Sequence, residues 1–335
     1  MPKDHLEFEK PLIELEDKIK ELKQFMQEKD IDLTDEIERL KEKSERVKQE
    51  VYSELEPWQI LKLARHAERP TTLDYINLIC DDFIELHGDR NYGDDRALIG
   101  GIGKIGDQPL TIVGHQKGKS TKDNINRNFG MAHPEGYRKA LRLMKQAEKF
   151  NRPILALINT PGAYPGIEAE ERGQAEAIAK NMMEMARLKV PIIIIVTGEG
   201  GSGGALGIGV GDKIMMLEYT YYSVCSPEAC AAILWKDASE AKTAAEALKL
   251  TAKDLLELGI VDEIINEPLG GAHKAFKESA ELLKEAILTN LQEIQSFSIS
   301  EMLEKRYDKF RQIGEYIEHS RIEVNDEQQD EVVNE

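Results

Sequence analysis

A glycine-rich turn after an apolar run is the part of this sequence best suited to chemistry. Residues 191–197 read Pro-Ile-Ile-Ile-Ile-Val-Thr, a β-branched run of strand length, and five glycines follow within residues 198–204. The next residues resume a helix-like pattern, so a strand-to-helix turn would leave backbone N–H groups unpaired where the helix dipole also favours negative charge. Glycines let a ligand oxygen approach these groups without meeting a Cβ. The pattern predicts a site for an anion or an oxyanion.

The same turn fits the fingerprint of dinucleotide-binding proteins. Gly198, Gly200 and Gly203 match G-x-G-x-x-G, and Glu218 lies about twenty residues further on, as an acidic ribose-binding residue would. A lone match of this kind is weak evidence. Only about nine residues separate Gly204 from the next strand-like run, which is short for the crossover between two parallel strands.

A third pattern in these glycines is the nucleophile elbow of serine hydrolases. The G-x-S-x-G sequence from Gly200 to Gly204 would make Ser202 the nucleophile, and Asp262 and His273 follow in the hydrolase order. The alternative needs no attacking side chain, because backbone N–H groups at this turn would stabilise a developing enolate or a similar oxyanion. The candidates for that role are Gly203, Gly204 and Ala205.

A second segment of the chain has the same order of elements. Residues 153–160 form another buried-type strand that begins at a proline, residues 161–166 form a Pro/Gly turn, and a helix begins near Glu168 with acidic residues in its first turn. In parallel sheets, ligands usually lie beyond the carboxyl ends of the strands. We therefore expect the two turns to lie on one edge of a sheet and to form neighbouring donor sites.

The composition is that of a soluble protein with one large domain and an appendage. The chain has 335 residues, 41% of them hydrophobic, and a formal net charge of −18, which argues against a broad basic face for nucleic acid. The N-terminus is charged, and the longest apolar run, residues 190–196, is too short to span a bilayer. The three cysteines have no C-x-x-C spacing, which disfavours disulfides and zinc. We expect a cytoplasmic chain without a metal site.

The first fifty residues predict a helical hairpin attached to the main domain. Apolar residues recur at alternating spacings of three and four in residues 12–26 and 33–51, with an interruption at residues 30–34 and Thr34 as the expected N-cap of the second helix. We expect two antiparallel helices with a narrow apolar seam that serves in oligomer formation or docking. The expected domains are residues 1–53 for this segment, 54–298 for the main domain, and 299–335 for a C-terminal helix and an acidic, disordered tail.

The middle of the chain alternates between strands and helices, which predicts an α/β domain. The expected helices cover residues 58–67, 71–86, 134–150, a segment that Ser226 caps, and much of 272–318. The expected strands cover residues 97–103, 109–114, 214–217, 221–224 and 259–265, in addition to the two that precede the glycine turns. Residues 116–130 are expected to form a polar loop.

Ordered motifs along most of the chain resemble those of one enzyme family. Residues 160–166 read Thr-Pro-Gly-Ala-Tyr-Pro-Gly, residues 170–174 read Glu-Glu-Arg-Gly-Gln, and residues 198–206 read Gly-Glu-Gly-Gly-Ser-Gly-Gly-Ala-Leu. Shorter matches lie at residues 86–90, 114–118, 128–130, 134–139, 226–228 and 268–273. The chain resembles the alpha subunits of the bacterial acetyl-CoA carboxylase carboxyltransferase over most of its length. It departs from the family pattern at Ala229, where a glycine is expected, and in the tail, which has no family counterpart.

The resemblance implies a crotonase-like fold, a spiral of ββα units, with the N-terminal helical hairpin and the C-terminal helices attached. It also implies transfer of a carboxyl group from carboxybiotin, carried by the biotin carboxyl carrier protein, to acetyl-CoA, which gives malonyl-CoA for fatty-acid synthesis. The chain would act with a beta subunit in an α2β2 heterotetramer, together with biotin carboxylase. Zinc and most coenzyme A contacts would belong to the beta subunit. A non-catalytic scaffold is the alternative, and the two intact glycine turns argue against it.

The implied reaction creates two oxyanions, the thioester enolate and the ureido oxygen of biotin. The biotin anion can take the α-proton itself, so no side-chain base is obligatory. By resemblance, the oxyanion hole of Gly203, Gly204 and Ala205 lies on the biotin side, and Gly162 and Ala163 line its surroundings.

Other residues near the two turns are candidates for substrate binding. Gly200, Gly201 and Ser202 belong to the first turn, whereas Tyr164 either walls the pocket or only packs, and Glu199 is expected to face the helix dipole. A local basic cluster is either a solvated loop or a surface that attracts the phosphates of coenzyme A or the carboxylate of carboxybiotin. This cluster consists of His115, Lys117, Lys119, Lys122 and Arg127, of which Lys117, Lys119 and Arg127 are the candidate substrate-binding residues.

Overall fold

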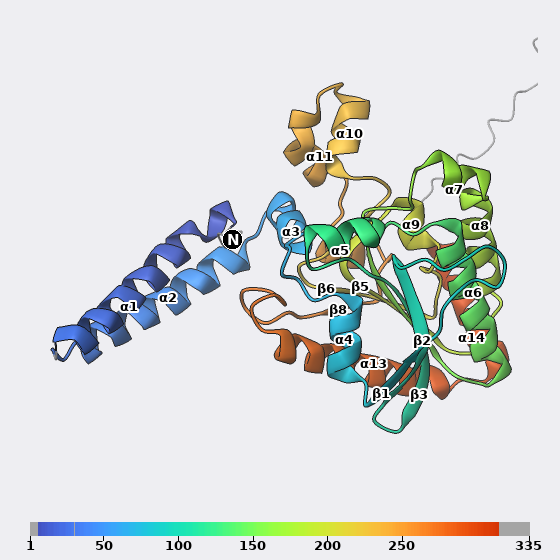
Figure 1. Cartoon of the computed structure of the whole chain (residues 1–335), viewed down its shortest axis with the longest axis horizontal. Helices are drawn as coiled ribbons and strands as arrows, with labels where there is room; N and C mark the ends of the chain where they lie inside the picture. The colour runs from blue at the N-terminus through green and yellow to red at the C-terminus, as the bar shows by residue number, and fades with distance from the viewer. Residues whose placement is uncertain (1–5, 30, 315–335) are drawn as a thin grey trace, which may run out of the picture.

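A mixed β-sheet forms the centre of the molecule, as Figure 1 shows. The computed structural model describes residues 6–29 and 31–314, and within these ranges eight strands form one sheet in the order β1-β2-β3-β4-β5-β6-β8, with β7 paired to β5. The strands are β1 (Asp82–Glu85), β2 (Leu98–Ile105), β3 (Gln108–His115), β4 (Ile154–Thr160), β5 (Ile192–Gly201), β6 (Lys213–Leu217), β7 (Tyr221–Ser223) and β8 (Glu263–Ile265).

Helices cover both faces of this sheet and extend from it at two places. The α-helices are α1 (Lys10–Lys29), α2 (Thr34–Ser53), α3 (Pro57–Ala64), α4 (Thr72–Ile79), α5 (Thr121–Asn126), α6 (Pro134–Lys149), α7 (Ile167–Glu171), α8 (Gln174–Met185), α9 (Ser202–Leu206), α10 (Pro227–Leu234), α11 (Ala241–Ala247), α12 (Ala252–Glu257), α13 (Phe276–Gln295) and α14 (Ile299–Gln312). Short 3-10 helices cover Glu7–Glu9, Asn128–Gly130 and Ala238–Glu240. In the described part of the chain, no helix combines the length and the apolar composition that a membrane span requires.

The strand directions place both glycine turns on one edge of the sheet. Strands β1, β2 and β3 pair antiparallel, whereas β3, β4, β5, β6 and β8 pair in parallel. The carboxyl ends of β4 and β5 are therefore neighbours, and Thr160 pairs with Gly200 at this edge. This arrangement confirms the expected α/β class and the expected juxtaposition of the two turns.

The buried strands separate two hydrophobic cores. Ala156 and Ile158 of β4 pack with α6 and α8 on one face, whereas Leu155 and Leu157 pack with α4 and α13 on the other. Side chains alternate along a strand, so a strand covered on both faces is apolar throughout. This explains the uninterrupted apolar runs before both glycine turns and the fixed position of the strand ends.

The N-terminal hairpin projects from the body, with α1 and α2 side by side (Figure 1). Ile19, Ile37 and Leu40 form its apolar seam, which confirms the expected helical pair. The prediction that Thr34 caps the second helix is wrong, because α2 begins at Thr34 itself. The carboxylate of Asp32 accepts hydrogen bonds from the backbone N–H and the hydroxyl of Thr34, at 3.0 and 2.6 Å, and so anchors the start of the helix.

Several predicted boundaries differ from the structure. The expected helix at residues 71–86 ends at Ile79, because residues 82–85 form β1 and pair with β2 at the edge of the sheet. The expected loop at residues 116–130 contains α5, which the side chain of Ser120 caps. The expected helical region at residues 272–318 consists of α13 and α14, and its end, like the predicted acidic tail, lies outside the described residues. The pairing of β1 with β2 therefore explains why the helix ends earlier than predicted.

Candidate active site

The two glycine turns touch each other at the carboxyl edge of the sheet. The Cα of Gly204 lies against the peptide group between Gly162 and Ala163, because a Cβ added at Gly204 would lie 2.5 Å from the nitrogen of Ala163 and 2.8 Å from the oxygen of Gly162. Real Cβ atoms essentially never approach other atoms within 3.0 Å. Only glycine therefore permits this contact, which brings together two of the predicted groups of site residues.

Three backbone N–H groups at this contact have no acceptor in the described part of the chain. They belong to Ala163, Gly203 and Gly204, of which Gly204 is buried and the other two are half-buried. Gly162, which was expected to line the hole, uses its N–H within the turn, because this group donates to Thr160 Oγ1 at 3.1 Å. Ala205, the third expected donor, is buried within α9. An oxygen carrying negative charge is the natural acceptor for the unpaired donors, since charge-assisted hydrogen bonds are the stronger ones.

The helix dipole expected at this turn contributes little in the described structure. Strand β5 continues to Gly201, because Glu199, Gly200 and Gly201 pair with β7. Helix α9 begins at Ser202 and is only five residues long, so its dipole is small. The individual N–H groups, and not a helix field, are what this turn offers an anion.

The same strand extension contradicts the dinucleotide interpretation. Gly198 and Gly200 lie within β5 and not in a phosphate-binding turn, so the first half of the G-x-G-x-x-G pattern is strand. The carboxylate of Glu218 accepts the N–H of Glu267 at 3.1 Å and takes part in local structure.

The hydrolase interpretation lacks its base. Ser202 is exposed and has the positive φ of 52° that a nucleophile elbow requires. Asp262, however, forms an ion pair with Lys309 at 2.5 Å, and the ring of His273 stacks on another histidine ring with centroids 4.1 Å apart. Among the described residues, no hydrogen bond joins Ser202, Asp262 and His273 into a catalytic set. These contacts contradict the Ser-Asp-His alternative.

The predicted basic cluster is not a set of free cations. Its first member, His115, is fully buried. Burial is the larger cause, and the nearby charge of Lys117 the smaller one, of the fall in the pKa of the imidazole to about 3. The ring is therefore neutral. Lys117 pairs with Glu199, Lys119 pairs with Asp74, and Arg127 pairs with Asp123 at 3.1 Å. Lys117 and Lys119 line one cavity of about 340 Å³ beside the glycine turns, whereas Arg127 is not among its lining residues.

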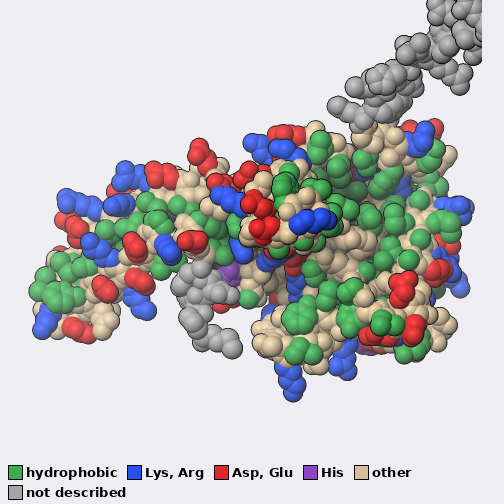
Figure 2. Space-filling model, turned by 90° about the horizontal axis from the view of Figure 1, so that it is seen from above, with side chains coloured by type: hydrophobic (Ala, Val, Ile, Leu, Met, Phe, Trp, Pro, Cys, Tyr) green, Lys and Arg blue, Asp and Glu red, His purple; other side chains and the backbone are tan. Residues whose placement is uncertain are grey.

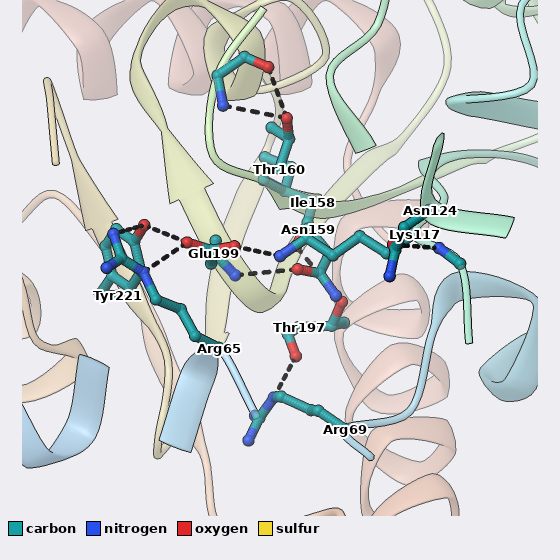
Figure 3. Close-up of polar contacts among 12 residues, drawn as sticks. Arg65, Arg69, Lys117, Asn124, Ile158, Asn159, Thr160, Thr197, Glu199 and Tyr221 are labelled. Carbon is teal, nitrogen blue, oxygen red and sulfur yellow. Dashed lines mark hydrogen bonds and ion pairs between the residues drawn. The ribbon is translucent and has the colours of Figure 1, made fainter. Parts of the chain in front are cut away.

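Glu199 is the centre of a buried polar network that joins four elements (Figure 3). Its carboxylate contacts Lys117 and accepts hydrogen bonds from Arg65 Nε at 2.8 Å and from the Tyr221 hydroxyl at 2.7 Å. Its own N–H donates to Asn159 Oδ1 at 3.2 Å. The expectation that Glu199 faces a helix dipole is wrong. Its side chain ties the end of β5 to β7, to the residue after α3 and to the segment after β3, and its backbone N–H binds β4.

The ionisation of Glu199 predicts a specific acid sensitivity. Burial on its own raises the pKa of this carboxyl, but Lys117, Arg65 and Tyr221 lower it from 4.5 to about 2. Because the folded-state pKa is below the unfolded value, the stabilisation is present above about pH 4.5 and is lost as the pH falls towards 2. The full effect is about 3 kcal/mol.

Denaturant unfolding of the native chain and of Glu199→Gln at about pH 6 and about pH 3 checks this expectation. The glutamine keeps the size of the side chain and cannot ionise. The difference in free energy of unfolding between the two proteins should shrink by more than half at the lower pH. An equal difference at both pH values would show that the charge of Glu199 does not stabilise the fold.

Tyr164 packs against a neighbouring loop. Its ring stacks on His133 with centroids 4.2 Å apart, and its N–H donates to the carbonyl of Ala132 at 3.0 Å. The side chain is half-buried, so it fixes the second glycine turn against the segment that precedes α6.

The described residues contain no group of three or more His, Cys, Asp or Glu side chains that could hold a metal ion.

Comparison with known proteins assigns this chain to a family. Residues 5–314 match the family model described as acetyl co-enzyme A carboxylase carboxyltransferase-like. The chain belongs to this family. The acetyl-coenzyme A carboxylase carboxyl transferase subunit alpha of Halalkalibacterium halodurans is 59% identical over 311 residues, which are 93% of this chain and 96% of that protein. The corresponding protein of Staphylococcus haemolyticus is 60% identical over 313 residues, 93% of this chain and 99% of that protein.

Solved structures confirm the crotonase-like fold expected from the family. One is a Pseudomonas malonate decarboxylase hetero-tetramer in complex with coenzyme A, with a TM-score of 0.57 and 16% identity over 70% of this chain and 91% of that chain. Another is the beta subunit of P. aeruginosa geranyl-CoA carboxylase, with a TM-score of 0.52 and 15% identity over 76% of this chain and 45% of that chain. At these identities the likeness establishes the fold alone.

An apolar groove that the sequence patterns did not indicate lies beside the first glycine turn. Ser202 and Gly203 open into a groove of about 490 Å³ whose other walls include Leu206, Tyr222 and Phe310. Phe310 is about a hundred residues away in the sequence, so no local spacing relates it to the turn. Figure 2 looks onto the face from which α10 and α11 project and shows hydrophobic side chains gathered across it.

Proposed function

We propose that this chain is the alpha subunit of an acetyl-CoA carboxylase carboxyltransferase and acts in the transfer of a carboxyl group from carboxybiotin to acetyl-CoA, which gives malonyl-CoA. The observation that carries the proposal is the identity of 59–60% to carboxyl transferase alpha subunits over 93% of the chain. The unpaired N–H groups at the two glycine turns support the same chemistry. Both substrates of this reaction place negative charge on an oxygen.

The role of this chain would be to hold such an oxygen. Carboxybiotin is a substrate here, carried on another protein, and it would supply the carboxyl group and then a nitrogen that accepts the α-proton of acetyl-CoA. The N–H groups of Ala163, Gly203 and Gly204 would stabilise the oxyanion, and no side chain of this chain would attack the substrate. The pairing of Lys117 with Glu199 and of Lys119 with Asp74 favours a structural or field effect for these lysines over a direct charge contact.

The finer assembly is part of the proposal. We expect a beta subunit that holds zinc and most coenzyme A contacts, an α2β2 heterotetramer in the cytoplasm, and delivery of carboxybiotin by the carrier protein that biotin carboxylase loads. The apolar groove beside Ser202 and the exposed Val224 and Leu206, which are 74% and 39% accessible, support a surface that a partner chain covers. A site open on one side in the isolated chain fits a reaction that needs two subunits.

Formation of malonyl-CoA by the chain co-expressed with a beta subunit, and supplied with carboxylated carrier protein, tests the proposal. We expect no product from either subunit alone. Ser202→Ala is the informative variant, because a serine hydrolase would lose nearly all its activity, whereas the proposed transferase keeps every backbone donor and loses far less. A complex that hydrolyses acyl-CoA and depends on Ser202 would overturn the assignment.

A further inference from the structure

Two buried hydroxyl groups hold the carbonyl ends of peptide groups in the glycine turns. Thr160 Oγ1 donates to the carbonyl oxygen of Gly162 at 2.7 Å, and Tyr137 Oη donates to the carbonyl oxygen of Gly204 at 3.3 Å. In a planar trans peptide, the C=O of one residue and the N–H of the next point in opposite directions. No cis peptide bond occurs in the described residues. Each hydroxyl therefore sets the direction of the following N–H, that of Ala163 or Ala205.

Both hydroxyl groups are themselves held in place. Thr160 is fully buried at the end of β4, and its Oγ1 also accepts the N–H of Gly162. Tyr137 is fully buried on α6, and its ring fills the space beside Gly207, where an added Cβ would lie 2.5 Å from the Cε1 atom. Asn181 donates to the carbonyl oxygens of both Tyr137 and Gly207 at 2.9 Å and so ties α8 to this contact.

We propose that Thr160 and Tyr137 are positioning residues of the carboxyl transfer reaction. They touch no substrate. Thr160 orients the peptide group that carries the Ala163 N–H, whereas Tyr137 anchors the carbonyl side of Gly204, whose own N–H is another of the three donors. A hydrogen bond weakens steeply when its angle departs from linear, so a rotated peptide loses its contribution to the transition state. The inference rests on the proposed function, because it assigns these hydroxyls to that reaction.

Thr160 offers a matched pair of variants in the assembled complex. Thr160→Val keeps the shape of the side chain and removes the hydroxyl, whereas Thr160→Ser keeps the hydroxyl. We expect the valine variant to lose between about tenfold and about a hundredfold in kcat with little change in the KM for acetyl-CoA, and the serine variant to recover most of this loss. Equal losses in both variants, or normal turnover by a folded valine variant, would overturn the proposal for Thr160.

Tyr137 provides an independent test. Tyr137→Phe keeps the buried ring and removes the hydroxyl that donates to the Gly204 carbonyl, so kcat should fall and KM should stay the same. Tyr75→Phe is the control, because Tyr75 is equally buried but its hydroxyl lies 3.4 Å from Ser279 Oγ in the opposite core. We expect its turnover to match that of the native complex. A fall in kcat of equal size in both tyrosine variants would indicate a general packing effect and would overturn the proposal for Tyr137.

Hydrogen exchange separates failure of this inference from failure of the proposed function. If the native complex forms no malonyl-CoA, the function is wrong, and exchange still reports on the peptide groups. Thr160→Val should speed amide exchange in residues 160–166, and Thr160→Ser should not, because only the valine frees the N–H of Gly162. Unchanged exchange in the valine variant would show that the hydroxyl does not hold this turn.

Discussion

Gly204→Ala should reduce malonyl-CoA formation by the assembled complex at least about a hundredfold, the typical cost of losing one oxyanion donor. The added Cβ would lie 2.5 Å from the nitrogen of Ala163, and the obstruction is backbone and not a flexible side chain. One of the two turns must therefore move, which displaces unpaired N–H groups of both. The measurement is kcat of the variant complex, with circular dichroism and size-exclusion chromatography to confirm that it folds and assembles.

Gly203→Ala is the matched control for this variant. A Cβ at Gly203 meets only the end of the Ile178 side chain at 3.6 Å, which is an ordinary contact. The backbone need not move, so we expect a much smaller loss of turnover although the two glycines are adjacent. If Gly204→Ala assembles and turns over like the native complex, the contact between the two turns has no part in catalysis.

Arg69→Met should lower the free energy of unfolding by about 3–5 kcal/mol, the largest effect on stability that we expect. The side chains of Arg69 and Glu267 are 2% and 0% exposed, and their ion pair includes two contacts between the guanidinium and the carboxylate. Arg69 Nε also donates to the carbonyl of Thr197 on β5 at 2.7 Å, as Figure 3 shows. Without the guanidinium, a buried carboxylate and a strand carbonyl lose their partner.

The double variant Arg69→Met/Glu267→Gln distinguishes charge from packing. Because the glutamine removes the stranded charge, the double variant should be more stable than Arg69→Met, although Glu267 also accepts the N–H groups of Tyr219 and Ala272. Lys104→Met breaks the exposed pair with Asp107 and should change the free energy of unfolding by no more than about 1 kcal/mol. Urea denaturation measures all three, and similar effects for Arg69→Met and Lys104→Met would contradict the argument.

Much of the donor site could be predicted because its chemistry is local. Gly203 and Gly204 were expected as donors, together with Ala205, from a glycine turn that follows an apolar run, and the parallel sheet brings the two turns together as expected. Ala163 was expected only to line the hole. The motifs around them also led to the right family. What local pattern could not show is that the N–H of Gly162 is already used by Thr160.

The errors arose where distant segments determine local structure. Residues 82–85 were predicted as helix, but they pair with β2 at the edge of the sheet. The glycines at the end of β5 were predicted as a turn, but they pair with β7. The basic cluster looked free because Glu199 and Asp74, which pair with its lysines, lie far away in the sequence. The serine hydrolase alternative stayed open for the same reason, because spacing cannot show that the ring of His273 stacks on another histidine.

Sequence alone therefore determined the chemistry of the donors, the class of fold and the family. A glycine has no Cβ to keep a ligand from its backbone, and an apolar run needs burial, whatever the rest of the chain does. Tertiary structure alone decided which charges are neutralised, which hydroxyls orient the peptide groups, and that Phe310 walls the groove beside Ser202. These properties depend on distances between residues from different elements, and such distances exist only after the chain has folded.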